Sequence, residues 1–322
     1  MLLLNEKDIL ACMSMKEAID SIDLAYKIYG QNNFLMPTRQ KVSTGDNTLI
    51  LMPSITENVM GTKLVTAFPN NEEDPTLHGL VVLASNHNGK MLSIMDGSFI
   101  TGFRTGAIGG SAARHLAPQH ASKLAVIGTG VQGFYQTIAV CTEREITDIY
   151  LYNRTEKKVQ SFIEKLQKEL GDSVRFHIKK TTKETIEQAE IIITATTSTT
   201  PVLPDEKDLL KGKLIIGIGS FLPQMREFPQ ALFEVADHLY VDSHDAIKES
   251  GDVIYPLENN LFEKENIKLF SSIFEQEDAF NHDYNEGSVV FKSTGMALFD
   301  VVIAEEIYKR ATEAKIGTHF SF

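Results

Sequence analysis

The sequence predicts an α/β protein of two domains, one of them built on a parallel sheet. The chain has 322 residues, roughly twice the size of a typical single domain. Across residues 41–95, short strand-like segments follow one another without helices between them, which favours an antiparallel or mixed sheet. From Lys123 onward, apolar strand-like segments alternate with helical stretches, which predicts a parallel sheet with helices on both faces.

The first region opens with a short apolar run and then a helix. Ser14 and Glu17 form a capping-box pattern, apolar residues follow at helical spacing, and Gly30 marks the end of the helix. Between the last two expected strands, Asn88-Gly89 predicts a tight hairpin turn. The strands expected in this region are 41–43, 48–52, 61–68, 80–85 and 91–95.

The second region holds the parallel strands. Helical stretches separate them, as in residues 156–170, and a last amphipathic helix is expected from Thr294 to Ala311. That helix carries Leu298 on its apolar side and Glu305 on its polar side. The apolar strands expected here are 124–127, 149–152, 191–193 and 214–216.

Composition and charge exclude several classes of protein. Hydrophobic residues make up 43% and charged residues 23%, which is ordinary for a folded protein and excludes general disorder. The net charge of −12 argues against a nucleic-acid partner. The two cysteines, Cys12 and Cys141, exclude a disulfide scaffold and fit a reducing compartment. Because no apolar stretch is long enough to span a membrane and the chain does not begin like a signal peptide, we expect a cytoplasmic protein with no membrane partner.

The strongest local signal is the segment 128–133, with the sequence GTGVQG, which fits the pattern G-x-G-x-x-G. It follows the expected strand 124–127 and opens an expected helix, whose N-terminus attracts anions. Gly128 permits a tight turn, Gly130 lets the backbone approach a diphosphate, and Gly133 lets the helix pack on the strand. The segment predicts a dinucleotide site, and a plain glycine-rich turn is the alternative. The expected cofactor contacts here are Gly128, Gly130, Val131 and Gln132.

The residues after the second parallel strand favour NADP(H) over NAD(H). An NAD site usually has Asp or Glu here to bind the ribose hydroxyls. This chain has Asn153, Arg154 and Thr155, so no carboxylate repels a 2′-phosphate and Arg154 can pair with one. The alternative for Arg154 is a solvated residue at a helix start. After the third strand, Thr196 and Thr197 suit close approach by the cofactor, although a plain turn is also consistent with them.

Several short motifs follow one another along nearly the whole chain. They are Gly61-Thr62-Lys63, Pro69-Asn70, Pro75-Thr76, Met95-Asp96-Gly97, TGFRTGA at 101–107, the loop 128–132 and FKSTG at 291–295. In this order they resemble the ornithine cyclodeaminase/mu-crystallin family. Its members include cyclodeaminases, amino-acid dehydrogenases, ketimine and cyclic-imine reductases, and a thyroid-hormone-binding crystallin. The resemblance therefore implies the fold and the cofactor site more firmly than the reaction.

The resemblance implies a Rossmann-type dinucleotide-binding domain, residues 116–293, inserted in an α+β substrate-binding and dimerisation domain. The second domain combines residues 1–115 with residues 294–322. It also implies a homodimer formed through the N-terminal sheets, with the active site between the two domains.

The resemblance places three basic residues, Arg39, Lys63 and Arg104, around the carboxylate of a small imino or amino acid. Arginine binds such a group with a bidentate fork. Arg104 is also expected to border the cofactor. Lys63 is placed close enough to the reacting centre to assist proton transfer, which makes it the candidate catalytic residue. Each of the three, taken alone, could equally be a surface cation.

Further contacts are expected from the C-terminal motif and from two other segments. Thr76, Ser220 and Ser293 are expected beside the cofactor, and Thr294 on the substrate side. His78 and His87 fit a structural role better than that of a proton shuttle. No His or Cys cluster has metal-ligand spacing, so no metal is expected.

One position departs from the cyclodeaminases of the family. In those enzymes an Asp after a Gly-rich strand end acts as general acid and base on the substrate amines. Aligning residues 217–227 on Pro223 and Glu227 places Phe221 at that position. Phenylalanine cannot transfer a proton, so the cyclodeaminase reaction is disfavoured and Phe221 is expected to form an apolar wall for the substrate ring. The stretch resembles members that reduce cyclic imines such as Δ1-pyrroline-2-carboxylate.

We therefore expect an NADPH-dependent oxidoreductase that reduces a cyclic imino acid by hydride transfer to its C=N carbon. Δ1-pyrroline-2-carboxylate, reduced to L-proline, is the leading substrate, and the piperideine homologue is a second. The alternatives are ornithine cyclodeaminase, an amino-acid dehydrogenase like alanine dehydrogenase, and a non-catalytic NADP-dependent binder of the mu-crystallin type. The sequence leaves the ring size and the physiological direction open.

Overall fold

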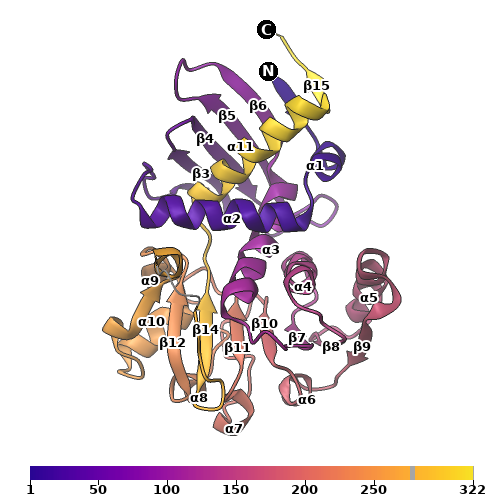
Figure 1. The fold of residues 1–322 in the computed structure, drawn as a ribbon, viewed down its shortest axis with the longest axis vertical. Coiled ribbons are helices and arrows are strands. Elements are labelled where there is room, and N and C mark those ends of the chain that lie inside the picture. Colours follow the sequence, from indigo (N-terminus) through magenta and orange to yellow (C-terminus); the bar gives the residue numbers. More distant parts are fainter. Residues whose placement is uncertain (276–279, 322) are drawn as a thin grey trace. The chain divides into compact units, whose positions relative to one another are not determined.

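The computed structural model describes residues 1–275 and 280–321, which form two compact units (Figure 1). Unit 1 comprises Met1–Arg104 and Met296–Phe322, and unit 2 comprises Thr105–Gly295. The division falls inside helix α3 (Gly97–Leu116), whereas the boundary expected from the sequence lies after residue 115. Both ends of the chain belong to unit 1. In the described ranges we find no helix with the length and hydropathy needed to cross a bilayer.

Unit 1 is built on a mixed sheet of seven strands in the order β15-β1-β6-β5-β4-β3-β2. All neighbours are antiparallel except β1 and β6, which run parallel. The predicted turn at Asn88-Gly89 joins β5 to β6, with Gly89 at a φ of +71°. The strands are β1 (Leu2–Leu4), β2 (Gln40–Thr44), β3 (Asn47–Ile55), β4 (Val59–Ala67), β5 (Leu77–Ser85), β6 (Met91–Asp96) and β15 (Thr318–His319). The predicted mixed sheet is therefore confirmed.

The helices of unit 1 are α1 (Glu6–Cys12), α2 (Met15–Gly30), the first part of α3, and α11 (Ala297–Ala314). The predicted capping box is present at the start of α2, where Ser14 and Glu17 each accept a hydrogen bond from the backbone of the other. Helix α11 packs on β3, β4 and β5 and so covers one face of the sheet. It begins at Ala297 rather than at the predicted Thr294, because Gly295 has a φ of +72°, outside the helical region.

Unit 2 is built on eight parallel strands in the order β13-β12-β14-β11-β10-β7-β8-β9. The strand order reverses between β7 and β10, and ligands of such sheets bind beyond the carboxyl ends of the strands at this point. The strands are β7 (Lys123–Ile127), β8 (Asp148–Tyr152), β9 (Arg175–Ile178), β10 (Ile191–Thr194), β11 (Leu214–Gly217), β12 (Ala236–Val241), β13 (Ile267–Leu269) and β14 (Ser288–Lys292). The predicted Rossmann-type sheet is confirmed, although β9, β12, β13 and β14 were not predicted from the sequence.

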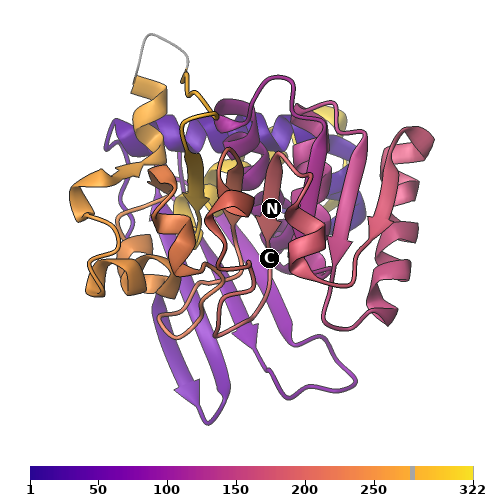
Figure 2. The same ribbon diagram turned by 90° about the horizontal axis from the view of Figure 1, so that it is seen from below.

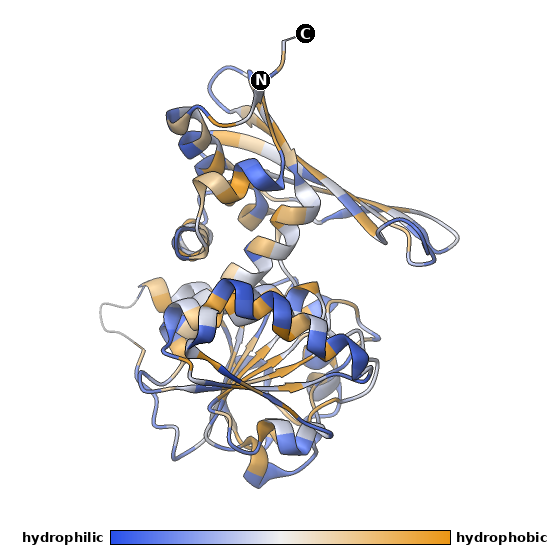
Figure 3. Ribbon diagram, turned by 90° about the vertical axis from the view of Figure 1, so that its right-hand side faces the viewer, coloured by the Kyte–Doolittle hydropathy of each residue, from blue (hydrophilic) through white to orange (hydrophobic). Residues whose placement is uncertain are grey.

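Helices cover both faces of this sheet, which Figure 3 shows edge-on with its apolar strands in the middle. In Figures 1 and 2, α5 lies at the edge formed by β8 and β9, and α9 and α10 lie towards the opposite end, near β12. The helices are the second part of α3, α4 (Val131–Glu143), α5 (Lys157–Leu170), α6 (Thr182–Ile186), α7 (Lys207–Leu210), α8 (Gln230–Phe233), α9 (Ala246–Glu249) and α10 (Gly251–Glu258). Short 3₁₀ turns cover Gly171–Ser173, Lys264–Asn266 and Phe270–Glu275.

Candidate functional site

The glycine-rich loop turns from β7 into α4 in a way that only its glycines allow. Gly128 has a φ of +104°, and a Cβ there would lie 2.4 Å from the carbonyl oxygen of Ala195. A Cβ on Gly133 would lie 2.1 Å from the carbonyl oxygen of Gly128 and 3.6 Å from the Val126 side chain of β7, so Gly133 lets α4 pack closely on the loop and the strand. A Cβ on Gly130 would meet nothing within 4 Å. The loop therefore borders open space at Gly130, where a diphosphate would need to approach.

Unpaired hydrogen-bonding groups lie at the start of α4 and in the loop before it. No side chain caps its N-terminus among the described residues, and its first turn carries no acidic residue. Val131 is exposed, with 66% of its surface accessible. The hydroxyl of Thr129 and the side-chain oxygen of Gln132 are buried, and neither has a hydrogen-bond partner within the described part of the chain. Because buried polar atoms are rarely left unpaired, these groups fit a bound dinucleotide.

A cavity of about 760 Å³ opens beside this loop, at the carboxyl ends of β7, β8 and β10. Two cations line it, Arg154 and Lys158, and none of the described lining residues is Asp or Glu. In a chain with a net charge of −12, such a lining favours an anionic ligand. The other predicted residues that line it are Gly128, Gly130, Asn153, Thr155, Thr196 and Thr197. The structure thus brings most of the predicted cofactor residues to one cavity.

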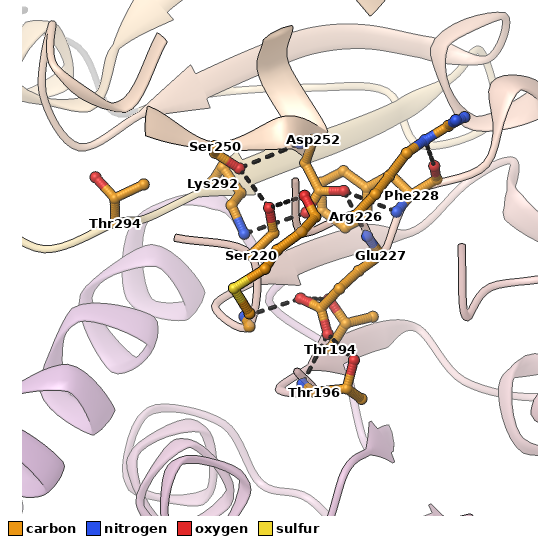
Figure 4. A network of polar contacts seen from close by, with 12 residues as sticks. Thr194, Thr196, Ser220, Arg226, Glu227, Phe228, Ser250, Asp252, Lys292 and Thr294 are labelled. Atoms are coloured by element: carbon orange, nitrogen blue, oxygen red, sulfur yellow. Dashed lines mark hydrogen bonds and ion pairs between the residues drawn. The ribbon is translucent and has the colours of Figure 1, made fainter. Parts of the chain in front are cut away.

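Glu227 joins the loops that follow β10 and β11 (Figure 4). It is fully buried, and one carboxylate oxygen accepts hydrogen bonds from the backbone N–H and the hydroxyl of Thr196, at 2.7 and 2.8 Å. The other oxygen accepts from the hydroxyl of Thr194 at 2.9 Å and from the N–H of Gly219 at 2.8 Å. Burial raises the pKa of Glu227, and Lys292 acts in the opposite direction. Glu227 therefore fixes the shape of the loop that carries Thr196.

Asp252 and Lys292 extend this buried network. Asp252, in the first turn of α10, accepts hydrogen bonds from the backbone N–H groups of Glu227 and Phe228, at 2.6 and 2.9 Å. The Nζ of Lys292 lies 3.2 Å from its other oxygen, without the geometry of a hydrogen bond. Both Asp252 and Lys292 are almost wholly buried. Lys292 is thus a cation enclosed with two carboxylates, those of Asp252 and Glu227.

Ser220 and Ser293 are buried and hydrogen-bonded inside unit 2. Ser220 donates to the carbonyl oxygen of Met225 at 2.6 Å and lies 2.9 Å from the hydroxyl of Ser250. Ser293 donates to Asp242 at 2.6 Å, and Asp242 also accepts from the N–H of Thr294 at 3.1 Å. These bonds shape the loops, and a direct contact of Ser220 or Ser293 with the cofactor stays a prediction. The hydroxyl of Thr294 is buried without a partner in the described ranges and stands apart from the dashed contacts in Figure 4.

Two of the three predicted basic residues of unit 1 contact the same carboxylate. The Nζ of Lys63, on β4, lies 3.0 and 2.9 Å from the two oxygens of Asp300 on α11. The Nε of Arg104, on α3, donates to the same carboxylate at 2.9 Å. Arg39, just before β2, is close enough to influence the Lys63 ammonium. The pair Lys63 and Arg104 thus shares one counter-ion, which leaves an excess positive charge in a buried place.

The pKa of Lys63 is lowered to about 8. Burial is the main cause, because it disfavours the charged ammonium, and the positive charge of Arg104 adds to it. Asp300 acts in the opposite direction, and Arg39 lowers the pKa slightly further. A lysine with this pKa holds a proton at neutral pH and releases it far more readily than an ordinary lysine, which suits general acid catalysis.

Two predicted residues lie apart from these clusters. Thr76 is exposed in the segment before β5, where its carbonyl oxygen accepts from the N–H of Phe68 at 2.8 Å. Phe221 lies in the loop after β11 and is 46% exposed. Its ring is thus available to a ligand of unit 2, while its contact with a substrate stays a prediction.

Several residues of these clusters were not predicted from the sequence. Asp300 could have been recognised as a lone carboxylate in the apolar run 297–304, because a charge in such a run is seldom buried without a partner. Lys158 could have been recognised from its place in the first turn of the helix that follows Arg154. The sequence contains no comparable signal for the network of Glu227, Asp252 and Lys292.

The family model named ornithine cyclodeaminase/mu-crystallin matches residues 1–315. The chain belongs to this family. The resemblance predicted from the motifs is therefore confirmed. A Δ1-pyrroline-2-carboxylate reductase of Bacillus cereus is 33% identical over 330 residues, which cover 100% of this chain and 100% of that protein.

Solved structures within the ornithine cyclodeaminase/mu-crystallin fold support the same assignment. Thermococcus litoralis Δ1-pyrroline-2-carboxylate reductase in complex with NADH and L-proline aligns with a TM-score of 0.91 at 29% identity, covering 99% of this chain and 100% of that one. An archaeal alanine dehydrogenase dimer with bound NAD aligns with a TM-score of 0.89 at 25% identity, covering 100% of this chain and 99% of that one. The predicted fold class is thereby confirmed.

Proposed function

We propose that this protein is a nicotinamide-dependent reductase of cyclic imino acids, and that it reduces Δ1-pyrroline-2-carboxylate to L-proline. The observation that carries the proposal is the buried pair Lys63 and Arg104, which shares the single carboxylate of Asp300. The excess positive charge suits a substrate that brings one carboxylate of its own. Likeness over the full length to two Δ1-pyrroline-2-carboxylate reductases supports the choice of substrate.

In the proposed reaction, Arg104, Arg39 and Lys63 hold the substrate carboxylate. When bound, the nicotinamide cofactor supplies a hydride, which the C=N carbon of the imine accepts. The electron pair of the C=N double bond goes to nitrogen, which takes up one proton to give the amine of L-proline. Lys63 is the proposed proton donor, with its pKa of about 8, and water is the alternative. Once the imine nitrogen is protonated, the carbon of the resulting iminium is strongly electrophilic, so the protein's main further contribution is alignment.

The alternatives within the family differ in what they require. Phe221 replaces the proton-transferring carboxylate expected of a cyclodeaminase, so deamination of ornithine is not proposed. Reductive amination of a 2-oxo acid is the second alternative, and the similarity of this fold to that of the alanine dehydrogenase supports it. A non-catalytic binder would hold the dinucleotide without turnover.

A substrate panel followed by the absorbance of NADPH separates these alternatives. The proposal predicts oxidation of NADPH by Δ1-pyrroline-2-carboxylate with no ammonia added. Turnover of pyruvate that requires ammonia would instead indicate an amino-acid dehydrogenase. Release of ammonia from ornithine with catalytic NAD would indicate a cyclodeaminase. A bound dinucleotide with no turnover on any of these compounds would indicate a binder.

We further propose that NADP(H) is preferred over NAD(H). Arg154 and Lys158 line the cavity beside Asn153 and Thr155, and none of the described lining residues is a carboxylate that would repel a 2′-phosphate. Arg154 precedes α5 by three residues and Lys158 lies in its first turn, and the N-terminus of this helix has no side-chain cap in the described chain. The positive end of this helix adds to the attraction for the phosphate.

Replacing Arg154 with alanine should raise the KM for NADPH by roughly 10- to 100-fold, as expected for a hydrogen bond to a charged group worth about 1.5–3 kcal/mol. The KM for NADH should change little, because NADH has no 2′-phosphate. Lys157→Ala is the matched control, since Lys157 is exposed and next to the cavity residues but does not line the cavity. Equal effects of Arg154→Ala on both cofactors would reject the assignment.

A homodimer and a cytoplasmic location are proposed with the same function. The sheet face of unit 1 opposite α11 carries the row Leu51, Leu64 and Leu80, and Leu80 is 47% exposed. A second copy of the chain would cover this apolar row. The likeness of this chain to an alanine dehydrogenase that is a dimer supports the proposal. The molar mass in solution, measured by light scattering, should be twice that of one chain. A monomer at micromolar concentration would contradict the dimer.

A further inference from the structure

Asp300 is the buried carboxylate that the two cations of unit 1 share. Its side chain is fully buried on α11, between the apolar residues Phe299 and Val301. Lys63 reaches it from β4 and Arg104 reaches it from α3, with distances of 2.9–3.0 Å. Three elements distant in sequence therefore meet at this one carboxylate.

The charges of this cluster do not balance, and a purely structural role for Asp300 would leave that imbalance unexplained. Among the contacts described for these residues, two buried cations share one buried anion, which leaves an excess positive charge in a place with little water and is unfavourable. A substrate carboxylate would compensate the remaining charge. The geometry of the three side chains is therefore that of a site prepared for one more anion.

We propose that Asp300 is the positioning residue of the proposed reaction, which holds the Nζ of Lys63 and the guanidinium of Arg104 at the place where the substrate carboxylate binds. It does not touch the reacting atoms in this assignment and acts through the two cations. The inference rests on the proposed function for the identity of the substrate, but the link between Asp300 and Lys63 can be measured without any substrate.

The charge of Asp300 also favours the protonated form of Lys63. The groups that act on the Lys63 ammonium are Arg104 from α3, Asp300 from α11 and Arg39 from the segment before β2. Burial and the two arginines lower its pKa, and Asp300 is the group that raises it. Without the Asp300 charge, the ammonium would lose its proton at a lower pH. A smaller fraction of the enzyme would then carry its proton donor at neutral pH.

The test is Asp300→Asn, which keeps the shape of the side chain and removes its charge. In protein labelled with 13C at the lysine Cε, the Lys63 signal, assigned by its loss in Lys63→Arg, should titrate near pH 8 in the parent protein. In Asp300→Asn the midpoint should move down by one pH unit or more. In Glu313→Gln, which removes an exposed charge from the same helix, the midpoint should not move. The alkaline limb of the pH profile of kcat/KM should shift by the same amount as the titration midpoint of the Lys63 signal.

An unchanged Lys63 midpoint in Asp300→Asn would overturn the proposal, whatever the enzyme reduces. If the midpoint shifts but no cyclic imine is reduced, the link holds and the proposed function fails. Should Asp300→Asn not fold, Arg104→Gln provides the opposite test, because loss of the repelling cation should move the midpoint upward. An unmoved midpoint in that variant would also overturn the proposal.

Discussion

Replacing Lys63 with methionine should lower kcat for Δ1-pyrroline-2-carboxylate by roughly 10²- to 10⁴-fold, the usual contribution of a positioned general acid. Lys63 is almost fully buried against Asp300, and its lowered pKa makes it the proposed proton donor. The fold should tolerate the change, because Asp300 and Arg104 would remain as a neutral ion pair. Steady-state kinetics measure the loss in kcat.

The affinity for NADPH should be unchanged in Lys63→Met, as measured by fluorescence titration. The matched control is Lys90→Met, which removes a lysine charge from an exposed position of the same unit. A kcat within fivefold of the parent enzyme would remove Lys63 from the mechanism and leave water as the proton donor. A large loss of NADPH affinity would mean that Lys63 serves the cofactor instead.

Replacing Lys292 with methionine should reduce the free energy of unfolding by about 3–5 kcal/mol, the cost of removing one partner of a buried charge pair. Lys292 is fully buried with the carboxylates of Asp252 and Glu227, and the variant would leave both without a cation. Urea denaturation measures the loss. Lys168→Met on the exposed side of α5 is the control, and its effect should be close to zero.

The destabilisation in Lys292→Met should depend on pH in a defined direction. Lys292 lowers the pKa of Glu227, so its removal raises that pKa further above the value in the unfolded chain. At a pH between the Glu227 pKa of the unfolded chain and that of the folded variant, the folded variant holds a proton that the unfolded chain has released. The stability of the variant therefore decreases as the pH rises through this range. The loss should therefore be smaller in mildly acidic than in mildly alkaline buffer. An equal loss at both would mean that Glu227 is not coupled to Lys292.

The local conformation of the glycine-rich loop 128–133 could be predicted from the sequence because it depends on neighbouring residues. The positive φ of Gly128 and the close approach of Gly133 to the carbonyl oxygen of Gly128 are properties of one short segment. The capping box of Ser14 and Glu17 is local in the same way. The family motifs added the prediction that Lys63 and Arg104 bind the substrate.

Helix α3 shows why some of the fold could not be predicted. Its sequence is rich in glycine, which disfavours helices. The structure gives the reason for two of these glycines: a Cβ on Gly106 would lie 2.6 Å from the Cβ of Tyr135, and one on Gly109 would lie 1.7 Å from the Gln136 side chain. Close packing of α3 against α4 therefore overrides the local preference. Such packing cannot be read from a single segment.

The charge clusters could not be predicted for a related reason. Asp300 is 237 residues from Lys63 in the sequence and meets it only because α11 packs on β4. In the sequence, Glu227 served only to align residues 217–227 with the family. In the structure it accepts hydrogen bonds from Thr194, Thr196 and Gly219. Buried charges acquire their partners from the tertiary fold, so their roles follow from the structure alone.

Transfer of deuterium from the cofactor to the product tests the central claim most directly. The enzyme would be given NADPH carrying deuterium on one or the other face of the nicotinamide C4, together with unlabelled Δ1-pyrroline-2-carboxylate and no ammonia. We predict L-proline with one deuterium on its α-carbon from one of the two labelled cofactors and none from the other, as judged by mass spectrometry. Absence of labelled proline from both, with ornithine or pyruvate turned over instead, would contradict the account.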